Sequence, residues 1–120
     1  MTEERLKLGA AGEEAAARYL RKLGARILER NFRSPVGEID IIARLKKQLL
    51  FVEVKTRSSG VFGSPAEAVG PRKQRQIIRA AQWYLQQDNN KNLQPRFDVV
   101  SVLHQGGAFA IEHFPSAFEL

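Results

Sequence analysis

The amino-acid sequence predicts an α/β fold in which a mixed central sheet is flanked by helices, in the order α-β-β-β-α-β-β. Two segments, residues 3–23 and 71–87, place apolar side chains at the three- and four-residue spacing of an amphipathic helix. The remaining segments alternate apolar with polar residues or are rich in β-branched residues, which indicates strands. The chain has 120 residues, 43% of them apolar, so we expect one core and a single domain over residues 1–120.

The first helix is expected over residues 3–23, and Gly24 supplies a left-handed stop. On a helical wheel, Glu13 lies at the border of the buried stripe. Gly9 and Gly12 lie on the buried side, where small residues would let the helix approach the sheet and hold Glu13 near its surface. The stripe itself consists of Leu8, Ala11, Ala15, Ala16, Tyr19, Leu20 and Leu23.

A first strand over residues 26–32 and a turn at residues 33–35 lead into a predicted hairpin that bears acidic residues. Side chains alternate in a strand, so Asp40 shares a face with Glu38, and Glu53 shares a face with Lys55. An antiparallel hairpin that turns at residues 46–47 would set Asp40 close to Glu53. The apolar sides of the two strands would consist of Ile39, Ile41, Val52 and Val54.

Residues 56–63 are polar and indicate a loop beside the acidic face. The sequence Ser64-Pro65-Ala66-Glu67 then matches a capping box with proline at the first helical position. A restart at Gly70-Pro71 predicts a longer helix to about Gln87, with Lys73 at the margin of its apolar stripe. The stripe is formed by Ile77, Ile78, Ala81, Tyr84 and Leu85, and the reverse face carries Arg72, Arg75, Arg79 and Trp83.

The chain is expected to end in a second hairpin, with strands over residues 96–103 and 108–114 and a turn at Gln105-Gly106-Gly107. We interpret Asp98 as a satisfied core or edge carboxylate paired with an arginine, with catalysis as the alternative. His104 and His113 are interpreted as surface residues of this hairpin.

The charge balance favours a polyanionic partner. Nineteen Lys and Arg against thirteen Asp and Glu give a formal charge of +6, which fits nucleic acid but also a ribosomal or membrane surface. The absence of cysteine excludes disulfides, zinc fingers and thiol nucleophiles. The sequence has no apolar run that fits a membrane span or a signal peptide, so we expect a cytoplasmic protein.

The residues of the acidic hairpin suit metal-assisted hydrolysis. Asp40 and Glu53 would hold Mg²⁺ or Mn²⁺, which prefer carboxylate oxygens and leave room for water and substrate phosphate. Lys55 would orient that water or stabilise the charge that builds up on the phosphate in the transition state. Glu13, from the first helix, could add a third carboxylate.

The pattern Gly37-Glu38-Ile39-Asp40 followed by Glu53-Val54-Lys55, with Gly12-Glu13 before it and Arg72-Lys73 after it, resembles the PD-(D/E)XK nuclease superfamily. From Gly12 to about Val102 it resembles more closely the YraN family of uncharacterised bacterial proteins, relatives of archaeal Holliday-junction resolvases. The hairpin turn departs from the Asp/Gly type common in such proteins, because it reads Lys46-Lys47-Gln48.

This resemblance implies a restriction-endonuclease-like core and Mg²⁺-dependent hydrolysis of DNA, with branched or structured DNA as the substrate. The active-site positions fall on Glu13, Asp40, Glu53 and Lys55. The resemblance also places DNA-facing basic residues at Arg57, Lys73 and Arg79.

Two other readings stay open. The exposed row formed by Arg72, Arg75 and Arg79 is either a solvated helix face or a nucleic-acid contact. The chain could then be a non-catalytic nucleic-acid-binding module with the same fold, or a scaffold for a protein partner. If it cuts branched DNA, a homodimer is expected, because two cuts call for a symmetric pair of sites.

Overall fold

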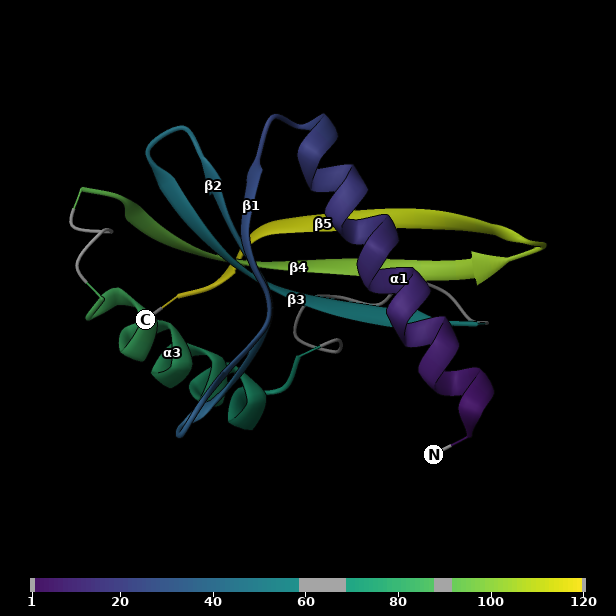
Figure 1. The fold of residues 1–120 in the computed structure, drawn as a ribbon, viewed down its shortest axis with the longest axis horizontal. Coiled ribbons are helices and arrows are strands. Elements are labelled where there is room, and N and C mark those ends of the chain that lie inside the picture. The colour runs from purple at the N-terminus through teal and green to yellow at the C-terminus, as the bar shows by residue number, and fades with distance from the viewer. Residues whose placement is uncertain (1, 59–68, 88–91, 120) are drawn as a thin grey trace.

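A five-stranded mixed sheet forms the centre of the molecule, in a computed structural model that describes residues 2–58, 69–87 and 92–119 (Figure 1). The order of the elements confirms the predicted α-β-β-β-α-β-β arrangement. The elements are α1 (Glu3–Lys22), β1 (Arg26–Ser34), β2 (Gly37–Leu45), β3 (Gln48–Arg57), α3 (Pro71–Leu85), β4 (Gln94–Gln105) and β5 (Ala108–Phe118).

The strands lie in the sheet in the order in which they occur along the chain. Only β3 and β4 run parallel; the three other neighbouring pairs are antiparallel. A parallel pair needs a long crossover connection, and α3 lies within it. The two-residue turn of the last hairpin uses Gly106 and Gly107, whose φ angles of 59° and 79° match the twist of the flanking strands.

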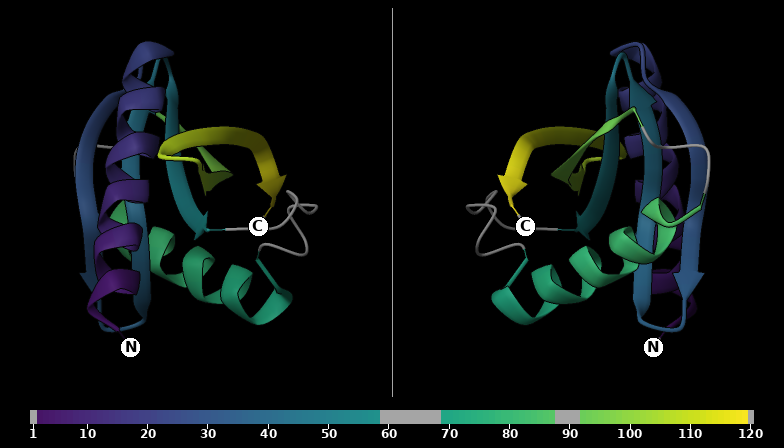
Figure 2. Two further views of the ribbon diagram at one scale, coloured as in Figure 1. Left: turned by 90° about the vertical axis from the view of Figure 1, so that its right-hand side faces the viewer. Right: turned by 90° about the vertical axis from the view of Figure 1, so that its left-hand side faces the viewer.

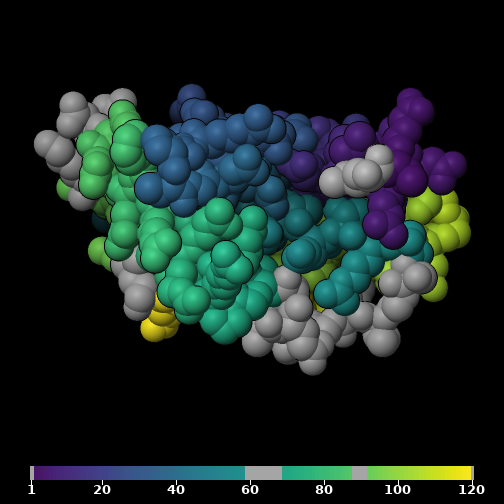
Figure 3. All heavy atoms as spheres, turned by 90° about the horizontal axis from the view of Figure 1, so that it is seen from below, coloured from purple at the N-terminus to yellow at the C-terminus, as the bar shows by residue number. Residues whose placement is uncertain are grey.

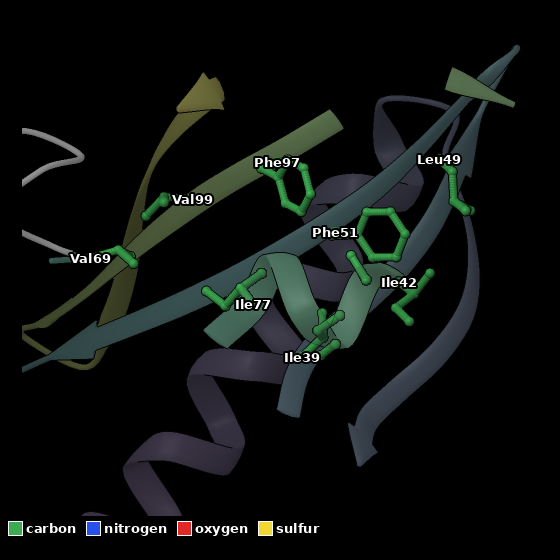
Figure 4. Packing of buried hydrophobic residues seen from close by; sticks show 10 residues of the cluster. Ile39, Ile42, Leu49, Phe51, Val69, Ile77, Phe97 and Val99 are labelled. Atoms are coloured by element: carbon green, nitrogen blue, oxygen red, sulfur yellow. The ribbon is translucent and has the colours of Figure 1, made fainter. Parts of the chain in front are cut away.

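The sheet separates two apolar clusters, one under each helix. Along β3, Leu49 and Phe51 belong to the cluster under α3, whereas Leu50 and Val52 belong to the cluster under α1. Figure 4 shows the first cluster, in which Ile77 of α3 meets side chains from β2, β3 and β4. In Figure 2 the two helices approach the strands from different sides. Burial on both faces explains the continuous apolar run at residues 49–52 of β3.

The two helices begin and end close to the predicted positions. Thr2 caps α1, because its Oγ1 accepts a hydrogen bond of 3.3 Å from the backbone N–H of Arg5. Gly24, with a φ of 100°, follows the last turn of α1 as expected. Pro71 opens α3. The capping box at 64–67 lies outside the described residues.

The strand β3 extends beyond its predicted end. It continues through Thr56 and Arg57, which were expected in a loop, because these residues pair with β4 at Val102 and Leu103.

Within the described residues, neither helix has the length and apolar composition that crossing a membrane requires.

Candidate active site

Asp40 lies where β2 and β3 part. The two strands pair from their turn only as far as Ile41 and Val52. One step beyond, the Oδ2 atom of Asp40 accepts a hydrogen bond of 2.8 Å from the backbone N–H of Val54. A side chain of β2 thus replaces a backbone partner for β3, and it fixes the half-buried Asp40 carboxylate in the gap between the strands.

At Asp40 the alternation of side chains along β2 is interrupted, so the face that lies under α3 before this residue lies under α1 after it. Ile39 packs in the cluster under α3 and Ile41 in the cluster under α1, although residues two apart in a regular strand share a face. On β1 the residue between the partners of these two isoleucines is Asn31, with a φ of 52°. Asparagine tolerates this left-handed conformation better than most residues. The prediction of one shared apolar side for Ile39 and Ile41 is therefore wrong, because the hairpin twists at Asp40.

Glu53 is a buried carboxylate beside Asp40. Its exposed fraction is 7%, and it lies on the face of β3 that carries Phe51 and looks toward α3. Burial raises the pKa of Glu53 to about 8, helped by the charge of Asp40 and a hydrogen bond between the two side chains. Lys73 and Lys55 lower this pKa, but by less. The two carboxyl groups thus lie within hydrogen-bonding reach of each other, as the predicted hairpin required.

Glu13 reaches the same region from α1. A Cβ at Gly12 would overlap the side chain of Thr56, so glycine lets this turn of the helix lie against β3, as the sequence predicted. At Gly9 there is open space, so the predicted close approach does not occur there. Burial and the charge of Asp40 raise the pKa of Glu13, although Arg30 lowers it.

One oxygen of Glu13, Oε1, is buried and has no hydrogen-bond partner in the described part of the chain. A buried carboxylate oxygen is costly to leave unpaired. Together with the raised pKa values of Glu13 and Glu53, it indicates that the described side chains supply too little positive charge to keep all the neighbouring carboxyl groups ionised.

The donor set fits a hard divalent cation of the magnesium type. Mg²⁺ is usually held by one or two carboxylates and completes its shell with water and substrate phosphate. Asp40 and Glu53 supply such a pair, and Glu13, whose pKa is raised by the charge of Asp40, has an unpaired buried oxygen. Among the described residues, no group of three or more His, Asp or Glu side chains is arranged to hold an ion. Three carboxylates around one cation therefore stay a prediction.

Two lysines accompany the acidic pair. Lys55 follows Glu53 on the same face of β3, is half-buried, and is close enough to lower the pKa of Glu53. Lys73 comes from α3, and its Nζ lies 3.9 Å from Oε2 of Glu53. Lys73, which the resemblance places among the DNA-facing residues, thus lies beside the acidic pair. Figure 3 shows this part of the surface, with the end of β3 (teal) between α1 (purple) and α3 (green).

The other residues predicted for the site surround it or lie apart. Arg57 is half-buried at the end of β3, and the arginines of the exposed α3 face point to solvent: Arg72, Arg75 and Arg79. Glu38 is exposed and pairs across the first hairpin with Arg33, at 3.6 Å. It is thus engaged in an ordinary surface ion pair of little energetic weight.

A second buried carboxylate, Asp98 in β4, is fully satisfied. Arg96 donates two hydrogen bonds to it, of 2.9 and 2.7 Å, and His113 Nε2 lies 2.7 Å from its Oδ2. The backbone N–H of Ser116 donates a further bond of 3.1 Å. Burial alone would raise the pKa of Asp98, but the bonds from His113 and Arg96 lower it. The arginine partner was predicted.

The interpretation of His113 as a surface residue is wrong. Only 9% of its side chain is exposed, and its Nδ1 lies 3.0 Å from the hydroxyl of Tyr19. The Tyr19–His113–Asp98 chain therefore ties α1 to β4 and β5. Tyr19 belongs to the apolar stripe of the predicted helix, which indicated that its side chain faces the sheet. The sequence did not indicate which strand this side chain contacts.

Comparisons with known proteins agree with this architecture. A family model described as the uncharacterised protein family UPF0102 matches residues 12–102. A UPF0102 protein of Syntrophotalea carbinolica is 58% identical over 120 residues, covering 100% of this chain and 98% of that protein. Another, of Caldanaerobacter subterraneus, is 53% identical over 95 residues, covering 79% and 78%.

A solved structure with a similar fold is that of Archaeoglobus fulgidus Hjc, a Holliday junction resolvase from an archaeal hyperthermophile. The TM-score is 0.50, and the match covers 89% of this chain and 76% of that one. Sequence identity over the match is 21%, so the likeness concerns the fold.

Proposed function

The chain belongs to the uncharacterised protein family UPF0102, and we propose that it is a metal-dependent endonuclease that hydrolyses phosphodiester bonds in DNA. The observation that supports this proposal most is the buried Glu53, set against Asp40 with Lys55 on the same strand. Such a coupled acidic pair destabilises the fold unless a cation or a proton neutralises it. A pair of buried acids that destabilises the fold is best explained by a role in binding a cation for catalysis.

The proposed ion is Mg²⁺ or Mn²⁺, held by Asp40 and Glu53, with Glu13 as the candidate third carboxylate. When bound, the ion would supply charge neutralisation at the phosphate and a more acidic water. The reaction adds water across one P–O bond of the backbone and leaves a sugar hydroxyl and a phosphate monoester.

The two lysines have separate tasks in this proposal. Lys55 would stabilise the negative charge that grows on the phosphate oxygens in the transition state. Lys73 already lies 3.9 Å from Glu53 and would favour the ionised form of that carboxylate beside the ion. Arg57, Arg72, Arg75 and Arg79 would contact phosphates further along the DNA, which positions the strand without reading its sequence.

The proposed substrate is branched or otherwise structured DNA, since the solved structure of similar fold is named a Holliday junction resolvase. Paired cuts across a junction need two active sites, so we propose a homodimer. We place the reaction in the cytoplasm, where bacterial DNA lies.

The test is a nicking assay on a four-way junction and on a linear duplex of the same sequence, with Mg²⁺ or with a chelator. We expect cleavage that needs Mg²⁺, favours the junction, and falls more than about a hundredfold in Asp40→Asn and in Lys55→Ala. Glu38→Gln is the matched control, because Glu38 is an exposed acid on the same strand as Asp40 and we expect it to cleave like wild type.

The alternative function gives a different pattern. If the wild type binds the junction but neither cleaves it nor takes up Mn²⁺, the chain is a nucleic-acid-binding module and the nuclease proposal fails. If charge removal at Arg75 and Arg79 leaves DNA affinity unchanged and no cleavage occurs, a protein-binding scaffold becomes the better explanation.

A further inference from the structure

A hollow of about 390 Å³ lies between the start of α1 and the end of β3. On the side of α1 it is bounded by residues from the first two turns, and on the side of β3 by the last strand residues and the one after them. Its lining consists of Arg5, Leu8, Gly9, Thr56, Arg57 and Ser58.

The hollow adjoins the acidic pair along both elements. On β3, Thr56 directly follows Lys55, and on α1, Gly9 lies four residues before Glu13. Four helical residues correspond to a rise of about 6 Å. This distance is similar to the spacing of neighbouring phosphates along one DNA strand. Figure 3 shows the N-terminal part of α1 and the end of β3 side by side at the same surface.

The lining has the chemistry of an oxyanion site. Two arginines and two hydroxyl-bearing residues border the hollow, and among the described residues that line it there is no acid. Within the described ranges, Arg5 forms no ion pair, whereas Lys7 on the same helix pairs with Glu3 at 3.8 Å. Guanidinium groups bind phosphate oxygens through charge-assisted hydrogen bonds that can be bidentate.

Space is available for a ligand beside Gly9. A Cβ built at Gly9 would have no atom within 4 Å, in contrast to Gly12, which packs against Thr56. The glycine at position 9 is thus not needed for helix packing. It leaves room between the helix and Arg57, and a helix interior normally disfavours glycine by comparison with alanine.

We propose that this hollow binds a backbone phosphate of the DNA, next to the phosphate that lies at the acidic pair. The inference rests on the proposed nuclease function and adds to it a second phosphate position, with Arg5 as a binding residue that the sequence pattern did not indicate. Holding two phosphates fixes the direction of the strand across the site, which one phosphate alone cannot do.

The first experiment compares three variants that each lower the net charge by one: Arg5→Ala, Gly9→Glu and Lys7→Ala. Junction affinity is measured in Ca²⁺ at several salt concentrations, with thermal unfolding as a check of folding. We expect Arg5→Ala and Gly9→Glu to bind about tenfold more weakly or worse. In these two variants the slope of log affinity against log salt concentration should become shallower by about 0.9. Lys7→Ala should stay close to wild type.

A charge-free companion separates electrostatics from shape. Gly9→Gln fills the hollow without adding charge, so we expect a loss of affinity smaller than that of Gly9→Glu. If all the single-charge variants lose affinity equally, including Lys7→Ala, the hollow is only part of a general basic surface and the inference is overturned.

The second experiment places one uncharged methylphosphonate linkage at successive positions around the cut. At the phosphate held in the hollow, we expect neutralisation to weaken binding by wild type but not by Arg5→Ala. If no position shows this dependence on Arg5 while wild type still cleaves, the inference fails and the nuclease proposal stands. If wild type neither binds nor cleaves DNA, both fail together.

Discussion

Two buried carboxylates on neighbouring parallel strands have opposite environments. Asp98 in β4 faces α1 and accepts hydrogen bonds from Arg96 and Ser116, with His113 against it. Glu53 in β3 faces α3 and lies against another carboxylate, Asp40; in the described part of the chain Lys73, at 3.9 Å, and Lys55 supply its positive charge.

The pKa values of the two acids move in opposite directions for this reason. Hydrogen bonds to the ionised form lower the pKa of Asp98, and burial beside a like charge raises the pKa of Glu53 to about 8. The comparison teaches that burial alone does not mark a functional acid. A buried acid with a full set of donors stabilises the fold, whereas one left with an excess of negative charge is suited to bind a cation.

The largest effect on stability is expected at Asp98. Asp98→Asn leaves the charge of Arg96 buried without its partner, so the free energy of unfolding should fall by about 3–5 kcal/mol. Urea unfolding measures this, with the exposed Glu112→Gln as a control that should change it by less than about 0.5 kcal/mol. A loss at Asp98 as small as that of the control would remove the contrast between the two acids.

The pH dependence of unfolding should separate the two acids. In the fold the pKa of Glu53 is about 8 against a usual 4.5, so the folded state holds a proton that unfolding releases. Stability from Glu53 is therefore lost as pH rises from 4.5 to 8. The pKa of Asp98 is lowered from 3.8, so stability from Asp98 is lost as pH falls below that value.

Thermal unfolding in chelator between pH 3 and pH 9 tests this pair of trends. We expect Glu53→Gln to abolish most of the decline above pH 4.5 and to melt above wild type at pH 8, while Glu38→Gln keeps the wild-type profile. A wild-type melting temperature that does not change from pH 5 to 8 would show that the pKa of Glu53 is not raised by burial beside Asp40.

A smaller effect is expected where α1 meets β3. Gly12→Ala forces a methyl group into Thr56, so we expect a loss of about 1–3 kcal/mol in the free energy of unfolding. Gly9→Ala on the same helix has open space and should gain up to about 1 kcal/mol. Denaturant titration of both variants checks the close approach that brings Glu13 to Asp40, and equal effects would contradict it.

Most of the fold could be predicted because it depends on local patterns. The spacing of apolar residues predicted both helices, and the turn residues at 46–47 and 106–107 predicted two hairpins. The first of these hairpins brings Asp40 to Glu53. The pairing of the acids follows from hairpin register, which is a short-range property.

The parts that could not be predicted depend on contacts between distant segments. The left-handed backbone conformation of Asn31 and the interrupted alternation at Asp40 occur where the first hairpin packs against both α1 and α3. His113 is buried between Tyr19 of α1 and Asp98 of β4, and Lys73 reaches Glu53 through the packing of α3. None of these contacts has a periodicity or a spacing that a single sequence displays.

The most direct test of the metal site is isothermal titration of Mn²⁺ into the folded protein at pH 7, in parallel for wild type, Asp40→Asn, Glu53→Gln and the control Glu38→Gln. The account predicts one saturable Mn²⁺ site per chain in wild type and in Glu38→Gln, lost in the other two variants. Wild type that takes up no Mn²⁺, or takes it up equally well without the Asp40 carboxylate, would contradict it.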